Sequence, residues 1–288
     1  MRLTRDEKRA IPFLLPGILV SIILIIYPLV SIIRMSFMEN AFGGGGGFAG
    51  FENFMRLSRN PMFSSALANT FQFTLASVLF SFIIGFGLAL IIQRKGIKLK
   101  GLWRSLLFIT WITPGVVKAT SWRWLFATDG GMVNHMLMSA GFIDNPVPWL
   151  TNPNFALTSI IIVQVWSAAP YVMLMMTAGL QQLPQDVFES ADIDGANWFH
   201  KVFRISLPML KHVSFICLLL LLVWSINEFA LIWIMTSGGQ NTMTISLMIF
   251  NQFQALNINA ASASAVIQLL ITMLLAGTYV VFVTRRDD

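Results

Sequence analysis

Polar and aromatic side chains recur at helical spacing inside two strongly apolar stretches of the sequence. The first set, spaced i, i+3, i+4 and i+7 so that a helix places it on one face, is Gln164, Ser167, Ala168 and Tyr171. The second set, spaced i, i+1 and i+4, is Trp224, Ser225 and Glu228. Polar groups in apolar spans are costly and mark pathways or binding sites by default. Aromatic faces stack on C–H surface and polar groups bond to hydroxyls, so these residues suit a neutral sugar. We expect them to line one cavity; the alternative is that each bonds a neighbouring helix or a partner subunit.

The common catalytic and nucleotide-binding motifs do not occur in the sequence. There is no G-x-x-x-x-G-K-[ST], no H-E-x-x-H and no G-x-S-x-G. The five-glycine run Gly43–Gly47 has no lysine after it and indicates a flexible linker. The three histidines are scattered, and Cys217 is the only cysteine, which excludes an internal disulfide. We therefore expect no catalytic residues, no metal site, no cofactor held by this chain and no enzymatic activity.

Composition indicates which elements must position these residues. Of the 288 residues, 56% are hydrophobic and 11% are charged, whereas a soluble domain carries about 25% charged residues. Lipid must therefore solvate much of the surface, since too little polar material remains to cover a globule. A span needs about 20 apolar residues. The six segments that qualify are 11–34, 70–93, 105–127, 155–179, 213–236 and 264–284. We predict an all-α membrane protein with six transmembrane helices.

The distribution of Lys and Arg predicts the orientation of these spans. Residues 1–10, loop 94–104, loop 180–212 and the C-terminus hold 14 of the 19 basic residues. The opposite loops, 38–69, 128–154 and 237–263, hold only Arg56 and Arg59. Because basic loops stay in the cytoplasm, both termini should be cytoplasmic. The net charge of +6 is thus a topology signal and does not indicate nucleic-acid binding. Lys118 and Arg123 fall within the third span, where we expect snorkelling or pairing rather than contact with an anionic substrate.

Loop 180–212 predicts two short cytoplasmic helices. Pro184 suits a helix start, Asp186 complements the helix dipole, and Gly195 permits a turn after about residue 194. A second helix is expected from Ala196 to about residue 207. Both helices carry apolar residues, which pack either against the protein's own span ends or against a cytoplasmic partner.

Loop 180–212 also carries a sequence motif that resembles one from a known protein family. Glu189, Ala191, Asp194, Gly195 and Ala196, followed by Ile205-x-Leu207-Pro208, resemble the "EAA" motif of ABC importer permeases, with Ser190 where Ala is usual. Further similarities to that family run through nearly the whole chain. They include Pro16, Tyr27, Pro28, Asn53, Asn69, Pro114, Asn134, Trp166 and Pro170. Thr236-Ser237-Gly238-Gly239 resembles the T-x-G-G-P segment of the sugar branch, with Gln240 in place of Pro.

The resemblance implies a type I ABC importer permease, with a cytoplasmic segment at 1–10 and a transmembrane permease domain at 11–288. In that family the motif forms helices that dock on an ATPase subunit. The residues so implied are Pro184, Phe188, Glu189, Ala191, Asp194, Gly195 and Ala196. The implied partners are a second homologous permease, an ATPase dimer that binds the ATP, an extracytoplasmic substrate-binding protein, a sugar and membrane lipid, with no nucleic acid.

The chain is similar to maltose-type permeases at the polar and aromatic positions of the fourth and fifth spans. Those permeases have Asn where Gln164 and Glu228 stand, and Glu228 would favour a cationic or amino sugar. The alternatives are a permease for another solute, such as glycerol phosphate or a polyamine, and an ion-coupled secondary transporter. The latter would show inverted repeats, and the docking motif would then be unexplained.

Overall fold

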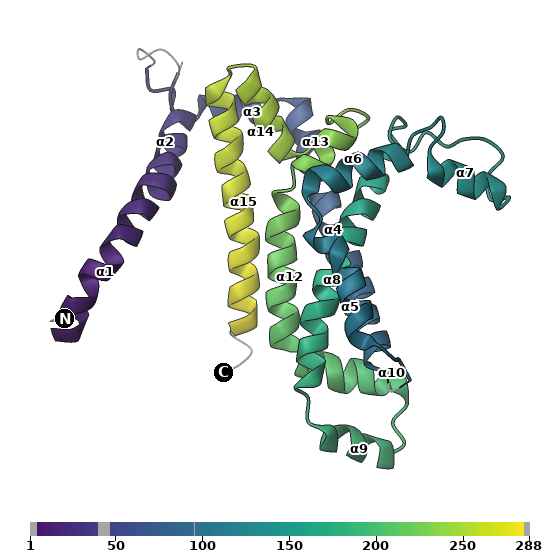
Figure 1. The fold of residues 1–288 in the computed structure, drawn as a ribbon. Helices are drawn as coiled ribbons and strands as arrows, with labels where there is room; N and C mark the ends of the chain where they lie inside the picture. The colour runs from purple at the N-terminus through teal and green to yellow at the C-terminus, as the bar shows by residue number, and fades with distance from the viewer. Residues whose placement is uncertain (1–4, 40–46, 95, 285–288) are drawn as a thin grey trace. The chain divides into compact units, whose positions relative to one another are not determined.

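A computed structural model describes residues 5–39, 47–94 and 96–284 (Figure 1). Arg2, Lys95, Arg285 and Arg286, which contributed to the charge count, and most of the glycine run lie outside the described residues. Within the described part the protein is helical, apart from one isolated β-bridge between Met38 and Phe48. The chain divides into two compact units, Met1–Ser64 with Met248–Ile271, and Ser65–Leu247 with Thr272–Asp288.

The first unit begins with one long apolar helix. α1 (Arg5–Ser21), the π-helical turn η1 (Ile22–Ile26) and α2 (Tyr27–Ser36) run on continuously. From Phe13 to Ser36 this helix is long and apolar enough to cross a membrane, and its large hydrophobic side chains are exposed. Lipid or another chain must cover such a surface.

Two side-chain amides organise the rest of the first unit. α3 (Glu52–Ser58) carries Asn53, whose Nδ2 donates to the carbonyls of Ser36 at 2.9 Å and Met38 at 3.0 Å. Asn259, near the start of α15 (Ile258–Thr284), also donates to Met38. Because backbone carbonyls exposed beyond a helix end need donors, these two amides fix the chain after α2.

The second unit contains the helices that carry the predicted site. They are α4 (Pro61–Gln93, from Ser65), α5 (Lys100–Ile112), α6 (Gly115–Leu125), α7 (Met132–Ser139), α8 (Ala156–Gln181), α12 (Lys211–Ile226) and α13 (Ala230–Thr236). α8 packs against α5, α12 and α13, and α6 packs against α13. The core between α4, α8 and α12 includes Phe86, Val172, Met176 and Leu221. α14 (Ile245–Gln254) follows within the predicted outer loop 237–263, and from Met248 on it belongs to the first unit.

Four of the described helices are long and apolar enough to span a membrane, and a bent pair adds a fifth candidate. The long helices correspond to the predicted spans 11–34, 70–93, 155–179 and 264–284. The predicted continuous helices 105–127 and 213–236 are both interrupted. Thr113 is extended before Pro114, because the proline ring disfavours the α conformation in the preceding residue. The sequence prediction was wrong on this continuity.

The second interruption separates α12 from α13. Asn227 Nδ2 donates to the Val223 carbonyl at 2.8 Å, and a carboxylate oxygen of Glu228 accepts the Leu231 N–H at 3.0 Å. Backbone groups released inside a membrane must find internal partners. These two side chains supply such partners at the break.

Loop 180–212 forms the two predicted helices. The first is α9 (Gln185–Ile193). The second runs from Trp198 to Met209 through α10 (Trp198–His200), η2 (Lys201–Ser206) and α11 (Leu207–Met209), and it bends by 75° into α12. Figure 1 shows α9 and α10 at one end of the second unit and α6, α7 and α13 at the other.

Candidate substrate and coupling sites

Three aromatic rings meet where the two interrupted spans break. The centroids of Trp111 and Tyr171 lie 4.8 Å apart, those of Trp111 and Trp224 4.9 Å, and those of Tyr171 and Trp224 5.0 Å. Trp111 stands in the last turn of α5 and Trp224 in the last turn of α12. Both breaks therefore lie beside one aromatic cluster, on the face of α8 that carries Tyr171. Discontinuous helices of this kind surround the binding sites of membrane transporters.

Polar groups from α6, α8 and the α12–α13 break lie near this cluster. Lys118 Nζ donates to Ser167 Oγ at 3.1 Å. α6 packs against α13, and a Cβ built on Gly115 would lie 3.9 Å from Ala230 Cβ, so Lys118 and Glu228 stand on either side of this helix contact. Ser167 lies one helical turn from Tyr171, and Glu228 four residues from Trp224. Arg123 donates instead to the Ile234 carbonyl of α13 at 3.2 Å. Lys118 thus points toward the predicted site, whereas Arg123 holds α6 to α13.

The remaining predicted residues occupy more interior positions. Ala168 is 2% exposed and belongs to the core, and Ser225 is also buried. Gln164 is 6% exposed, and its side-chain carbonyl oxygen has no hydrogen-bond partner among the described residues. An unsatisfied buried carbonyl costs about 1–3 kcal/mol. The Gln164 side-chain carbonyl is therefore an unsatisfied hydrogen-bond acceptor on the same face of α8 as Tyr171.

Sequence reasoning missed Trp111. It treated the third span as one helix and singled out only its charged residues and proline. The available signal was an aromatic residue three positions before Pro114, because a proline that ends a helix exposes its last turn to neighbours from other helices.

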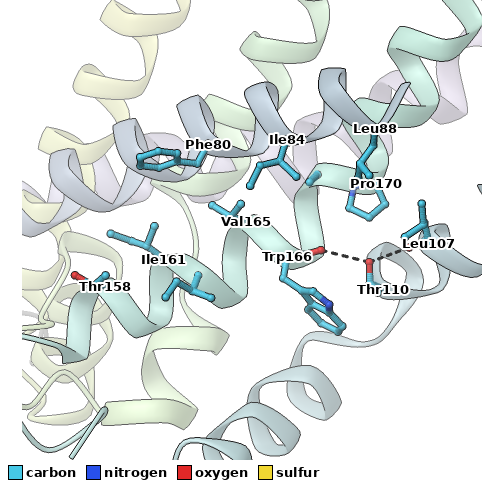
Figure 2. A pocket seen from close by; sticks show the side chains of 12 residues that line it. Phe80, Ile84, Leu88, Leu107, Thr110, Thr158, Ile161, Val165, Trp166 and Pro170 are labelled. Carbon is cyan, nitrogen blue, oxygen red and sulfur yellow. Dashed lines mark hydrogen bonds between the residues drawn. The ribbon is translucent and has the colours of Figure 1, made fainter. Parts of the chain in front are cut away.

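The opposite face of α8 lines an apolar cavity of about 520 Å³ (Figure 2). α4, α5 and α8 contribute its walls, which are Phe80, Ile84, Leu88, Leu107, Thr110, Thr158, Ile161, Ile162, Val165, Trp166, Ala169 and Pro170. With two threonine hydroxyls as the only polar side chains apart from the indole of Trp166, this cavity cannot satisfy the hydroxyls of a sugar. It suits an acyl chain or an apolar helix.

One contact in that cavity explains how α8 tolerates an internal proline. Pro170 has no N–H, so it cannot bond to the carbonyl of Trp166. Thr110 Oγ1 shares its one hydrogen between that carbonyl, at 3.4 Å, and the Leu107 carbonyl of its own helix, at 3.0 Å (Figure 2). α8 therefore continues through Pro170, and α5 is joined to it near Trp111.

The first unit has a polar hollow of its own, of about 490 Å³. Its charged groups are Glu39, Glu52 and Arg56, of which the last two form an ion pair. None of the predicted site residues lines it. We therefore place the candidate substrate site in the second unit.

The predicted coupling residues form a compact turn at α9. Pro184 precedes the helix, Asp194 ends it, and Gly195 follows at φ +73°. Gly195 N–H donates to the Asp192 carbonyl at 3.1 Å and Ala196 N–H to the Ala191 carbonyl at 2.9 Å. This is a Schellman C-cap, which favours glycine because a Cβ is disfavoured at positive φ.

The apolar residues of α9 and the helix after it divide into two groups. Ala191 and Val202 are buried within the protein, and Phe188 is half-buried. Ile193 is 88% exposed, and Phe199 and Phe203 are also exposed. Glu189 is exposed on α9. Part of the apolar surface thus packs inward, and part remains uncovered at the end of the unit. Such a surface is typical of a protein–protein interface.

Comparison with known proteins gives the class of this chain. Residues 81–287 match the family described as binding-protein-dependent transport system inner membrane component. The chain is 30% identical over 272 residues to the trehalose/maltose transport system permease protein MalF of Thermococcus litoralis, covering 93% of this chain and 91% of the relative. It is 29% identical over 287 residues to the sulfoquinovosyl glycerol transport system permease protein SmoG of Agrobacterium fabrum, covering 98% and 92%.

A solved structure has the same fold. The crystal structure of a bacterial ABC transporter involved in import of the acidic polysaccharide alginate contains a chain that superposes with a TM-score of 0.86 at 22% identity, covering 99% of both chains. The protein therefore belongs to the family of binding-protein-dependent transport system inner membrane components. It is a multi-pass permease subunit of an ABC importer in the inner membrane, and it is not an enzyme.

Proposed function

We propose that this chain is one of two permeases in an ATP-driven sugar importer, and that it holds sugar at the Trp111–Tyr171–Trp224 cluster. The observation that carries the proposal is the mutual contact of these rings at two helix breaks, with the Lys118–Ser167 hydrogen bond one helical turn from Tyr171. Aromatic faces and hydrogen-bonding groups together match a sugar ring. Relatives named for maltose, trehalose and arabinooligosaccharides support the sugar class.

The proposed mechanism uses α9 as the mechanical input. Glu189 and the exposed apolar residues dock on an ATPase subunit, and the cap at Gly195 fixes the angle of α9. Closure of two ATPases then moves the two permeases, which exposes the site alternately to an extracytoplasmic binding protein and to the cytoplasm. ATP itself binds to the ATPases. The contribution of this chain is that its α9 contacts with the ATPase differ between the outward-open and inward-open states.

We propose six membrane crossings with cytoplasmic termini. The crossings are the helix through α1 and α2, then α4, α5 with α6, α8, α12 with α13, and α15. With Cys217 replaced by serine, a cysteine at Ile193 on α9 should react with an impermeant maleimide only in inside-out vesicles. A cysteine at Met136 on α7 should react only in right-side-out vesicles. The reverse pattern would overturn the orientation.

The function is tested by purifying the tagged chain from its native membrane and identifying its partners by mass spectrometry. Recovery of a P-loop ATPase and a second permease is expected. The recovered complex and its binding protein are then reconstituted and screened for ATP-dependent uptake of labelled neutral sugars, glycerol phosphate and a polyamine. Uptake of sugars supports the proposal, and uptake of only another solute overturns it. Recovery of the chain without an ATPase would favour a self-contained transporter.

A further inference from the structure

Two opposite charges adjoin the aromatic cluster, and each retains hydrogen-bonding capacity. Lys118 has three N–H donors, and one of them bonds to Ser167 Oγ at 3.1 Å. One oxygen of Glu228 accepts the Leu231 N–H at 3.0 Å. The described residues show no further hydrogen bond to the other oxygen of Glu228.

The two charges lie on neighbouring helices without forming a direct ion pair. α6 packs against α13 beside Gly115 and Ala230, three residues from Lys118 and two from Glu228, yet the ion pairs among the described residues are Glu52 with Arg56 and Asp192 with Lys201. A pair kept only to hold α6 in place would gain most by closing into direct contact, because unpaired charge is costly away from water. A hydroxyl can accept from the ammonium and donate to the carboxylate at once.

We propose that Lys118 and Glu228 together determine the specificity of the site. The pair hydrogen-bonds to the neutral hydroxyl groups of a sugar and disfavours binding of charged sugars. This inference rests on the proposed sugar-import function. The pair has no net charge, so neither an amino sugar nor an acidic sugar gains free energy from it as a whole. An amino group near Glu228 also meets Lys118, and a carboxylate near Lys118 also meets Glu228. The presence of Lys118 thus removes the preference for amino sugars that Glu228 alone would give.

The experiment measures weak sugar binding directly on the complete transporter. The complex is placed in lipid nanodiscs without the binding protein, whose own selectivity would otherwise dominate. Saturation-transfer NMR then compares glucose, glucuronate and glucosamine at a pH where glucosamine is protonated. Lys118→Gln and Glu228→Gln keep the side-chain shape approximately while removing one charge each. Because the readout is a ratio of signals within one sample, it does not depend on how much complex is recovered.

Wild type should prefer glucose to both charged sugars. Glu228→Gln should raise glucuronate binding relative to glucose by about fivefold, and Lys118→Gln should do the same for glucosamine, since a single partly exposed charge pair contributes up to about 1 kcal/mol. The double variant should again prefer glucose. Arg123→Gln is the matched control, because this cation of α6 bonds to the Ile234 carbonyl instead, and it should leave the order unchanged.

An identical order of the three sugars in wild type and in both single variants would overturn the inference and leave the sugar function standing. The absence of signal from all three sugars would also overturn it. In that case the uptake screen described above decides separately whether the proposed function fails.

Discussion

α8 and α9 follow one another along the chain but differ in how they are held. Most of α8 is buried, and it packs against α5, α12 and α13. On α9 only Ala191 is buried. A buried helix carries its functional side chains in positions fixed by its neighbours, whereas an exposed helix is fixed by its own cap and by whatever docks on it. Changes at α8 should therefore affect folding and substrate binding, and changes at α9 should affect coupling alone.

The largest effect is expected at the contact between α4 and α8. A Cβ built on Gly85 would lie 2.4 Å from the Ala169 carbonyl oxygen and 2.4 Å from Val172 Cβ. Overpacking of a tight core costs about 1–3 kcal/mol or more. Gly85→Val should lower the yield of assembled, monodisperse complex about tenfold in size-exclusion chromatography. Gly87→Val is the control, because a Cβ at Gly87 meets nothing within 4 Å. Equal yields of the two variants would show that α4 and α8 do not pack this closely.

The next effect concerns the cap of α9. Gly195 has φ +73° with nothing within 4 Å of a built Cβ, so its constraint is conformational and not steric. A β-branched residue in this conformation costs about 1–2 kcal/mol. Gly195→Val should leave membrane insertion intact and lower uptake about fivefold while ATP hydrolysis continues. Gly195→Asn, which tolerates positive φ, should retain most uptake. Wild-type uptake in Gly195→Val would count against the coupling role of this turn.

A third prediction tests the aromatic residue that the sequence analysis missed. Trp111→Ala removes a ring that contacts both Tyr171 and Trp224, and such contacts are each worth about 0.5–1.5 kcal/mol beyond area burial. Sugar uptake should fall about tenfold, and Trp111→Phe should restore most of it. Trp124→Ala on α6 removes an exposed indole and should change uptake little. If both alanine variants behave alike, the cluster is not the binding site.

The smallest effect is expected at the ion pair between α9 and the helix that follows it. Lys201 bonds to Asp192, whose side chain is 67% exposed. Exposed ion pairs contribute about 0–1 kcal/mol. Asp192→Asn should therefore shift the thermal midpoint of the complex by no more than about 2 °C and leave uptake unchanged. A large loss of uptake would mean that the pair, and not the Gly195 cap, sets the direction of α9.

The sequence predicted the local features of both helices well. Residues 155–179 form a helix almost as expected, with Gln164, Ser167 and Tyr171 on one face, and residues 185–193 form the predicted helix with Gly195 at its end. Hydrophobic composition and turn chemistry act over a few residues, so they can be read from the chain directly. The positions of the six predicted segments follow from the same local signal.

The sequence failed where a helix breaks and where helices meet. Pro114 was named only as a similarity to ABC importer permeases, and its effect on Thr113 was not anticipated. The interruption after Ile226 has no proline or glycine to mark it. The break after α12 depends on Asn227 and Glu228 bonding to nearby backbone groups. Such side chains compete with helical hydrogen bonds only when tertiary packing favours the break.

The sequence by itself determined that this chain enters a membrane, where its long apolar helices lie, and that α9 ends in a glycine cap. Only the tertiary structure decided that Trp111 joins Tyr171 and Trp224, that Lys118 reaches Ser167, and that the two faces of α8 differ so sharply. The physical reason is the distance along the chain over which each effect acts. Hydropathy and backbone preferences depend on a few neighbouring residues, whereas contacts across helices depend on where each helix breaks and which face it turns to its neighbours.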